Sequence, residues 1–159
     1  MQLEEGQKLL VLRYSDFLQK NCIQLHVDLI DKLGFCWFGK IGQRPSQKFI
    51  TQIMAFDKPQ ILLHSSTKSF LCEVLEVTYD KPESGYPQYY EEALFRRNHN
   101  PSAYFKLKSI EQVPKNILKS FIVVSSKNYL SLSLHRSMNS VFFVEYSNLN
   151  EENSNEDTL

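Results

Sequence analysis

The fold is decided by the stretch QILLHSSTKSFLCEVLEVTY, residues 60–79, in which two apolar runs surround a short polar segment. Residues 60–66 and 69–79 are typical of the two strands of a hairpin, with Ser66, Thr67 and Lys68 between them. The second run alternates imperfectly between apolar and polar side chains, which indicates a strand that is buried on both faces for part of its length. This stretch therefore predicts a β-hairpin within a larger sheet.

Further strands and helices extend from this hairpin in both directions. Short apolar runs predict strands at residues 8–14, 35–41, 103–113, 121–126 and 139–146. Apolar residues at helical spacing predict a helix that begins after Ser15-Asp16 and ends before Gly34, a short helix after Ser46, and a helix over 128–138. The mixed order of elements predicts an α+β fold in which two or three helices flank a curved sheet or a small β-barrel.

The stretch DKPESGYPQYYEEALFRRNHNP, residues 80–101, interrupts this pattern with three prolines, three tyrosines and little aliphatic content. We expect a long connection that contains one helical turn at 91–95. Connections of this length inside a domain are often functional, and the tyrosines argue against disorder.

The charge of the chain is balanced overall but unevenly distributed. The last nine residues hold four of the 18 acidic residues and none of the 18 basic ones, which leaves residues 1–150 with a net charge of +4. A mildly basic body permits a nucleic-acid partner. We expect one domain over residues 1–146, followed by an acidic flexible tail or linker at 147–159.

The three cysteines, Cys22, Cys36 and Cys72, favour a reducing compartment over a disulfide framework because their number is odd and no two are closely spaced. Cys22 and His26 have the spacing C-x3-H, but no second pair of ligands accompanies them, so we predict no metal and no cofactor. The sequence has no apolar signal segment and no run of membrane-spanning length. These features predict a cytoplasmic protein without a membrane partner.

The sequence contains none of the common zinc-protease, nucleophile-elbow or phosphate-loop motifs. The charged cluster from Glu91 to His99 offers acid and base groups for a small nuclease or hydrolase, although charge-rich loops are usually solvated. Ser65 and Ser66 adjoin His64, but adjacent residues on a strand point to opposite faces and do not form a nucleophile–base pair. We therefore predict a binding module with no catalytic residues.

Aromatic side chains lie near polar and cationic groups in three segments, which are residues 35–40, the strand end at 64–66 and the tyrosine-rich loop. Aromatic faces beside hydrogen-bonding groups are suited to an unstacked nucleic-acid base. The residues that we predict to line a base-binding pocket are Trp37, Phe38, His64, Ser65, Ser66, Tyr89 and Tyr90. The residues that we predict to hold phosphates are the cations flanking these segments, Lys40, Arg44, Arg96 and Arg97.

The stretch FCWFGKIG, residues 35–42, is expected to present different aromatic side chains on its two faces. Alternation along a strand places Cys36 and Phe38 on one face and Phe35 and Trp37 on the other. We expect Trp37 to lie at the wall of the pocket and Phe38 to pack inward.

The order of these segments resembles PUA-superfamily domains of the EVE and YTH type. The segments that carry the resemblance are KLLVLRY (8–14), FCWFGKIG (35–42), ILLHSS (61–66), FLCEVLEVTYD (70–80), YPQYYEE (86–92), AYFKLKSI (103–110) and VFFVEY (141–146). Leu71-Cys72 stands where the EVE pattern has a glycine, and the N-terminal aromatic motif of typical EVE proteins is missing, so the chain is more similar to the superfamily than to that subtype.

The resemblance implies a pocket that receives a modified base, flipped from DNA or exposed in RNA, with DNA preferred. Similar domains are fused to motor or nuclease modules, so the resemblance also implies the specificity module of a modification-dependent restriction or defence system, with a C-terminal motor or nuclease module as a second partner. The alternative is a protein-interaction domain of the same fold, in which the aromatic residues form the core and the tyrosine loop is a partner surface.

Overall fold

The computed structural model describes residues 3–148 and contains seven strands, three α-helices, a π-helix and a 3₁₀-helix among them. The elements in chain order are β1 (Lys8–Arg13), α1 (Cys22–Leu33), β2 (Cys36–Lys40), α2 (Gln47–Ile53), β3 (Gln60–His64), β4 (Ser69–Thr78), η1 (Glu91–Phe95), β5 (Ala103–Val113), η2 (Lys115–Ser120), β6 (Phe121–Val123), α3 (Leu130–Arg136) and β7 (Val141–Tyr146). The α+β class is thus as predicted, and η2 is an additional helix that the sequence patterns did not indicate.

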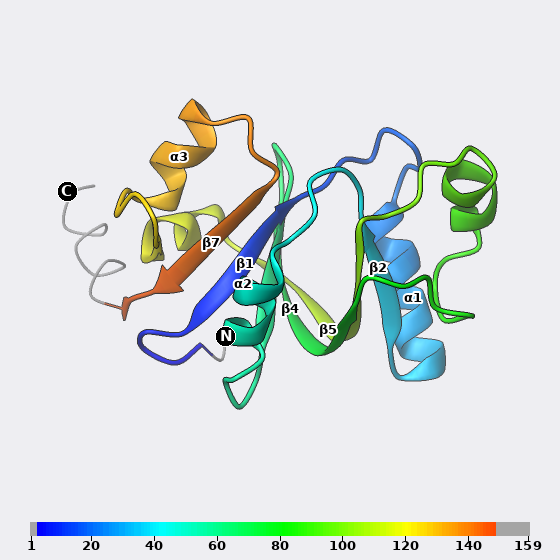
Figure 1. The fold of residues 1–159 in the computed structure, drawn as a ribbon, viewed down its shortest axis with the longest axis horizontal. Coiled ribbons are helices and arrows are strands. Elements are labelled where there is room, and N and C mark those ends of the chain that lie inside the picture. The colour runs from blue at the N-terminus through cyan, green and yellow to red at the C-terminus, as the bar shows by residue number, and fades with distance from the viewer. Residues whose placement is uncertain (1–2, 149–159) are drawn as a thin grey trace.

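All seven strands form one mixed sheet in the order β2-β5-β4-β3-β1-β7-β6. The predicted hairpin is β3 paired antiparallel with β4, and β1 runs parallel to β3. Among the described residues the edge strands β2 and β6 do not pair with each other, so the sheet is open and the barrel alternative does not apply. Figure 1 shows how strongly the sheet twists between β7, which lies next to the edge strand β6, and β2 at the opposite edge.

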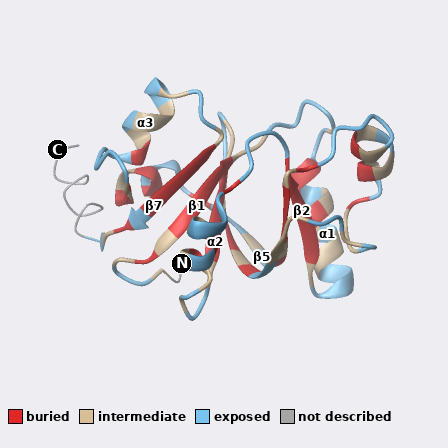
Figure 2. Ribbon diagram, viewed as in Figure 1, coloured by how far each residue is buried: buried red, intermediate tan, exposed pale blue. Residues whose placement is uncertain are grey.

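The sheet is buried on both faces because apolar residues occupy successive positions of its central strands. Leu10 and Leu12 of β1 belong to one core, which also contains residues of α1 and α2, whereas Leu9 and Val11 belong to a second core beneath η2 and α3. Successive side chains of a strand point to opposite faces, which explains this division. Figure 2 shows buried residues along the strands and on the helix faces that meet them.

Helix α1 begins later than the sequence predicted. Ser15 and Asp16 do not start it; instead the Ser15 hydroxyl accepts the Phe17 N–H at 3.0 Å, and Asn21 adopts a left-handed conformation with φ of 60° directly before the first helical turn. The polar side chains of this segment stabilise turns in competition with helix. The connection over residues 14–21 therefore crosses the surface as a loop between β1 and α1, where it forms part of the site described below.

The end of α1 and the start of α2 lie at the residues that the sequence predicted. Gly34, with φ of 87°, ends α1, and its N–H donates to the carbonyl of Ile30 at 2.7 Å. Ser46 caps α2 by accepting the Lys48 N–H at 3.2 Å. Within residues 3–148 there is no helix with the length and apolarity needed to cross a bilayer.

The predicted boundary between domain and tail lies just after β7. Ser147 donates from its hydroxyl to Glu5 at 2.8 Å, and the Asn148 N–H donates to the same carboxylate at 2.8 Å. These two residues are therefore attached to the body of the domain. The rest of the predicted tail, residues 149–159, lies outside the described part of the chain.

Candidate functional site

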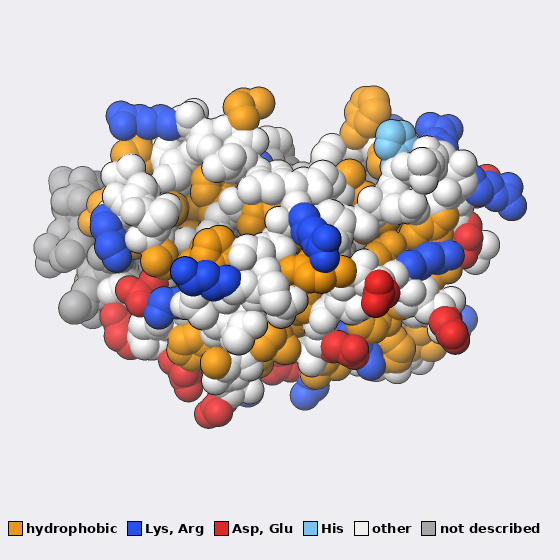
Figure 3. Space-filling model, viewed as in Figure 1, with side chains coloured by type: hydrophobic (Ala, Val, Ile, Leu, Met, Phe, Trp, Pro, Cys, Tyr) orange, Lys and Arg blue, Asp and Glu red, His pale blue; other side chains and the backbone are white. Residues whose placement is uncertain are grey.

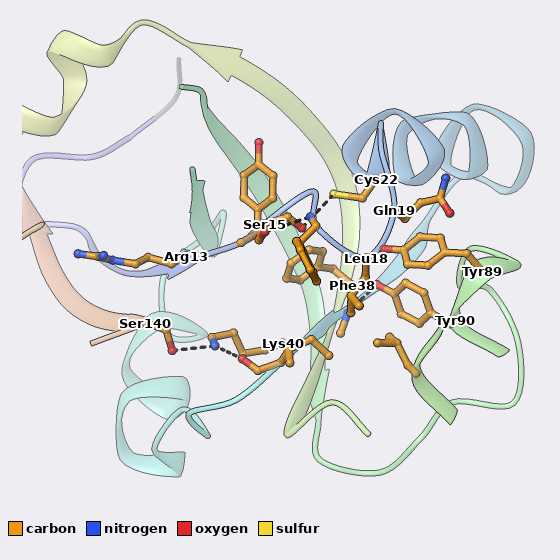
Figure 4. A pocket seen from close by; sticks show the side chains of 15 residues that line it. Arg13, Ser15, Leu18, Gln19, Cys22, Phe38, Lys40, Tyr89, Tyr90 and Ser140 are labelled. Carbon is orange, nitrogen blue, oxygen red and sulfur yellow. Dashed lines mark hydrogen bonds between the residues drawn. The ribbon is translucent and has the colours of Figure 1, made fainter. Parts of the chain in front are cut away.

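A pocket with a volume of about 500 Å³ opens where the end of β1 faces β2. It is built from the 13–19 segment, the end of β2, the start of α1, the loop with Tyr89 and Tyr90, and Ser140, as Figure 4 shows. Its surface is mostly apolar, and the side chains that supply it include Phe17, Leu18, Phe38, Ile41, Tyr89 and Leu94. A pocket of this size lies within the range of roughly 300–1,000 Å³ that is usual for sites binding small molecules.

Lys40 links the edge strand β2 to the start of β7 across the floor of this pocket. Its ammonium group donates to the Ser140 hydroxyl at 2.9 Å and to the carbonyl of Ile41. Lys40 lies on the edge strand β2, whereas Ser140 directly precedes β7, and in the sheet order four other strands lie between β2 and β7. The sheet therefore curls far enough to bring β2 close to the start of β7 without closing, and the pocket lies at this contact.

Lys40 is also an unusual residue for a protein interior because it is only 1% exposed. Lysine is almost never fully buried unless its charge has a partner. Burial lowers the pKa of Lys40 to about 8, because the charged form loses its hydration. The pocket floor thus carries an ammonium group that is cationic at neutral pH and close to its titration range.

Tyr90 holds one wall of the pocket in place through a chain of buried hydrogen bonds. The carbonyl of Cys22 accepts a hydrogen bond from Nδ1 of His26 at 2.6 Å, so Nε2 of His26 carries no proton and accepts from the Tyr90 hydroxyl at 2.6 Å. The Tyr90 oxygen in turn accepts the Gly39 N–H at 3.0 Å. Burial lowers the pKa of His26 to about 4, which keeps the imidazole neutral in this arrangement.

The tyrosine-rich loop is ordered by contacts among its own aromatic rings. Tyr86 stacks on Tyr90 with ring centroids 5.7 Å apart, and Phe95 meets Tyr86 edge to face at 5.2 Å. The Tyr86 hydroxyl donates to Glu91 at 2.5 Å, and this hydrogen bond raises the pKa of Tyr86 to about 12. Tyr89 meets Tyr90 edge to face at 5.0 Å and remains partly exposed on the pocket wall.

The residues predicted to form a single base-binding site are divided between two hollows. Phe38, Tyr89 and Tyr90 line the pocket, together with Lys40. His64, Ser65 and Ser66 line a second, larger hollow of about 890 Å³, which we call the basin. The two hollows share Arg13, Tyr14, Ser15 and Phe17 and therefore lie on either side of the same segment.

Trp37 lies outside both hollows, which corrects the prediction that it forms the pocket wall. Its ring packs beside Gly85, where a Cβ atom would lie 3.2 Å from Cδ1 of Trp37, and the ammonium group of Lys106 lies 5.9 Å from the ring. Phe38 packs in the core that contains α1 and α2, and it also lines the pocket. The two side chains face opposite sides of β2, as the alternation predicted, but the pocket lies on the Phe38 side.

The four predicted phosphate-binding residues do not converge on one place. Lys40 is inside the pocket, whereas Arg44 stacks over the Tyr79 ring at 3.6 Å and lines a separate hollow. Arg96 forms an ion pair with Glu92 at 2.7 Å, with both side chains largely exposed. Arg97 is exposed in the turn that follows η1.

The two carboxylates considered for catalysis and the cysteine considered as a metal ligand are engaged in other contacts. Glu91 accepts from Tyr86 and Glu92 pairs with Arg96, which accounts for the two carboxylates of the charged cluster. The Cys22 thiol donates to Asp16 at 3.1 Å, and burial raises the pKa of Cys22 to about 12, so the reactive thiolate is disfavoured. Residues 3–148 contain no group of three or more side chains placed to hold a metal ion.

Sequence reasoning missed a large part of the pocket. Phe17, Leu18 and Gln19 come from the segment after β1 that was expected to be helical, Ser15 directly precedes that segment, and Arg13 is the last residue of β1. A signal was present, because Phe17-Leu18 is an apolar pair within the otherwise polar run SDFLQKN. The remaining missed residues are Tyr14, Cys22, Gly39, Ile41, Leu94 and Ser140.

Comparison of the chain with models of protein families, with curated proteins and with solved structures found no significant match.

Proposed function

We propose that this protein is a nucleic-acid reader that holds a modified base in the pocket, with DNA preferred over RNA and without chemistry of its own. The observation that carries the proposal is the pocket itself, which combines aromatic walls with a buried cation at the floor. A base removed from its stack needs flat apolar surfaces for its faces and hydrogen-bonding groups for its edge. Both kinds of group are present in the pocket.

The floor of the pocket indicates which edge of a base it would accept. An ammonium group has three N–H donors, and Lys40 uses two of them on Ile41 and Ser140 among the described residues. The third is free for a ligand atom. The expected ligand therefore presents an acceptor, such as a ring nitrogen or a carbonyl oxygen, toward Lys40.

The walls supply stacking surface. Tyr89 is fixed by its edge-to-face contact with Tyr90, and Phe38 is fixed by the core, so neither ring has to be ordered when a ligand enters. Preorganised aromatic groups lower the entropic cost of binding. A methyl group on the base would add apolar contact in a pocket with Phe17, Leu18 and Ile41 around it.

The proposal is tested by fluorescence polarisation with labelled DNA that contains 5-methylcytosine, 5-hydroxymethylcytosine or N6-methyladenine, with RNA that contains N6-methyladenosine, and with unmodified strands. We expect one modified probe to bind at least tenfold more tightly than its unmodified counterpart. Tyr89→Ala should weaken that binding by about 5- to 100-fold, since stacking contributes about 1–3 kcal/mol per base. Tyr129→Ala is the matched control, because Tyr129 is exposed and lines neither hollow.

Two results would contradict the proposal. One is a wild-type protein that binds none of these strands, which would favour a protein-interaction domain. The other is Tyr89→Ala that binds every strand as Tyr129→Ala does, which would place any nucleic-acid contact outside the pocket.

A further inference from the structure

The basin lies next to the pocket, on the other side of the 13–17 segment. Its floor and walls come from the end of β1, the turn between β3 and β4, η2 and α3. It is larger than the pocket, and polar side chains contribute much more of its surface, among them His64, Ser65, Ser66 and Thr67. The two hollows therefore differ in chemistry although they share one wall.

The charged groups of the basin are mainly cationic. Arg13, Lys115 and the two histidines His64 and His135 line it, and Asp16 is the single acidic residue among the lining residues. No ion pair involving Arg13 or Lys115 occurs within residues 3–148. The basin thus contains two permanent cations whose charges are not neutralised by a carboxylate in direct contact.

Contacts with the protein fix the two cations. Arg13 donates from Nη2 to the carbonyls of Leu134 at 2.7 Å and Ser137 at 3.0 Å. Lys115 donates to the carbonyl of Ser66 at 2.9 Å. The pKa of His64 is lowered, first by burial and then by the charges of Arg13 and Lys115.

The position of the acidic side chains on the surface is also relevant to the charge around the basin. Figure 3 shows the acidic side chains of this face mainly in its lower half and on its right side, below the upper edge where Figure 1 places α3 and the loop between β1 and α1. Phosphate groups attract cations at such sites, and neutralising each one releases counterions.

We propose that the basin binds the phosphodiester backbone of the strand whose base occupies the pocket. The inference rests on the proposed function and deepens it, because it names the path of the strand. Phe17 lines both hollows and is 92% exposed, so it would stand between the backbone and the inserted base. Arg13 and Lys115 would contact phosphate oxygens, and the hydroxyls of Ser65 and Ser66 would donate to them.

Lys115 offers the cleanest test, because its side chain is exposed and carries no core packing, whereas Arg13 holds the end of α3. Binding of a labelled single-stranded DNA to Lys115→Gln is measured by fluorescence polarisation between 50 and 300 mM NaCl. Lys115→Arg tests rescue by charge. Lys119→Gln is the matched control, because it removes a lysine from the same 3₁₀-helix at a position that lines neither hollow.

We expect Lys115→Gln to weaken binding about three- to tenfold for modified and unmodified strands alike, and to reduce the slope of log K against log[salt] by about 0.7, the value for one phosphate contact on a single strand. Lys115→Arg should restore both quantities, and Lys119→Gln should match the wild type. If the wild type prefers a modified base but Lys115→Gln has an unchanged affinity and salt slope, the backbone path is wrong and the proposed function stands. If the wild type binds no strand, and inorganic phosphate alone occupies the basin, both proposals fail.

Discussion

Replacing the buried Lys40 by Met should remove the group proposed to bind a ligand at the pocket floor without a large loss of stability. Methionine has a similar length and needs no hydrogen bond. The substitution removes the ammonium group at the pocket floor and its contacts with Ser140 and Ile41, whose polar atoms line a pocket that water can enter. Removing a charge from a site of this kind is often neutral or stabilising.

The size of the effect follows from the lowered pKa of Lys40. Burial lowers it from 10.5 to about 8, so the folded protein binds fewer protons than the unfolded chain between these two pH values. The unfolding free energy of the wild type, relative to Lys40→Met, therefore rises as the pH increases from about 8 to about 10.5. One pKa unit corresponds to about 1.4 kcal/mol, and with solvent screening from the pocket we expect a total gain of about 1–2 kcal/mol.

Thermal melts at several pH values from 7 to 10 measure this difference. For a domain of this length, the expected gain corresponds to a change of about 3–6 °C in the difference between the two melting temperatures. Ionisation of tyrosines affects both proteins and cancels in the comparison, and Lys48→Met serves as the control because Lys48 is exposed on α2. A difference between wild type and Lys40→Met that stays constant from pH 7 to 10 would refute the account of Lys40 as a desolvated cation.

Three further substitutions test the architecture of the site. Tyr90→Phe should lower the unfolding free energy by about 1–3 kcal/mol, because it leaves the Gly39 N–H and Nε2 of His26 buried without a partner. An unchanged melting temperature would contradict a stabilising role for this chain of hydrogen bonds. Gly39→Ala should cost about 1–3 kcal/mol, since the new Cβ would lie 2.6 Å from Cγ of Pro101, and urea unfolding measures the loss. Phe17→Ser should leave stability within about 0.5 kcal/mol but weaken single-strand binding at least fivefold; equal affinity would show that Phe17 does not contact the strand.

Local patterns were sufficient to predict most of the elements, because each strand carries its own signal. The run from Ala103 to Val113 is β5 within the predicted limits, and the helical turn expected at 91–95 is η1. The predicted start of α1 was too early because Ser15 and Asp16 have side chains that can cap a helix. The same side chains also stabilise turns, so their presence does not tell which of the two follows. Here Ser15 bonds to Phe17, and Asn21 adopts a left-handed conformation before the helix begins.

Which residues line the pocket depends on how separate segments pack together, and no single segment of the sequence contains that information. Alternation along β2 assigned Trp37 and Phe38 to opposite faces, but both are buried, and only the packing of α1 and of the tyrosine loop decides which face borders a pocket. His64 was likewise grouped with the aromatic residues by residue type, although the segment after β1 separates it from Tyr89. Spacing in the sequence predicts faces of an element and does not predict which faces meet.

The contact between Lys40 and Ser140 illustrates why local sequence patterns do not predict which faces meet. The two residues are 100 positions apart, and within residues 3–148 β2 does not pair with β7, the strand that follows Ser140. Their approach results from the accumulated twist of the intervening strands and from the irregular register of β4 against β5 around Glu73–Glu76, where bulges increase the bend. The pocket is thus a consequence of sheet curvature. A variant that straightened β4 at this position would be expected to open the pocket while leaving each strand intact. The distance between labels at positions 40 and 140 would then increase.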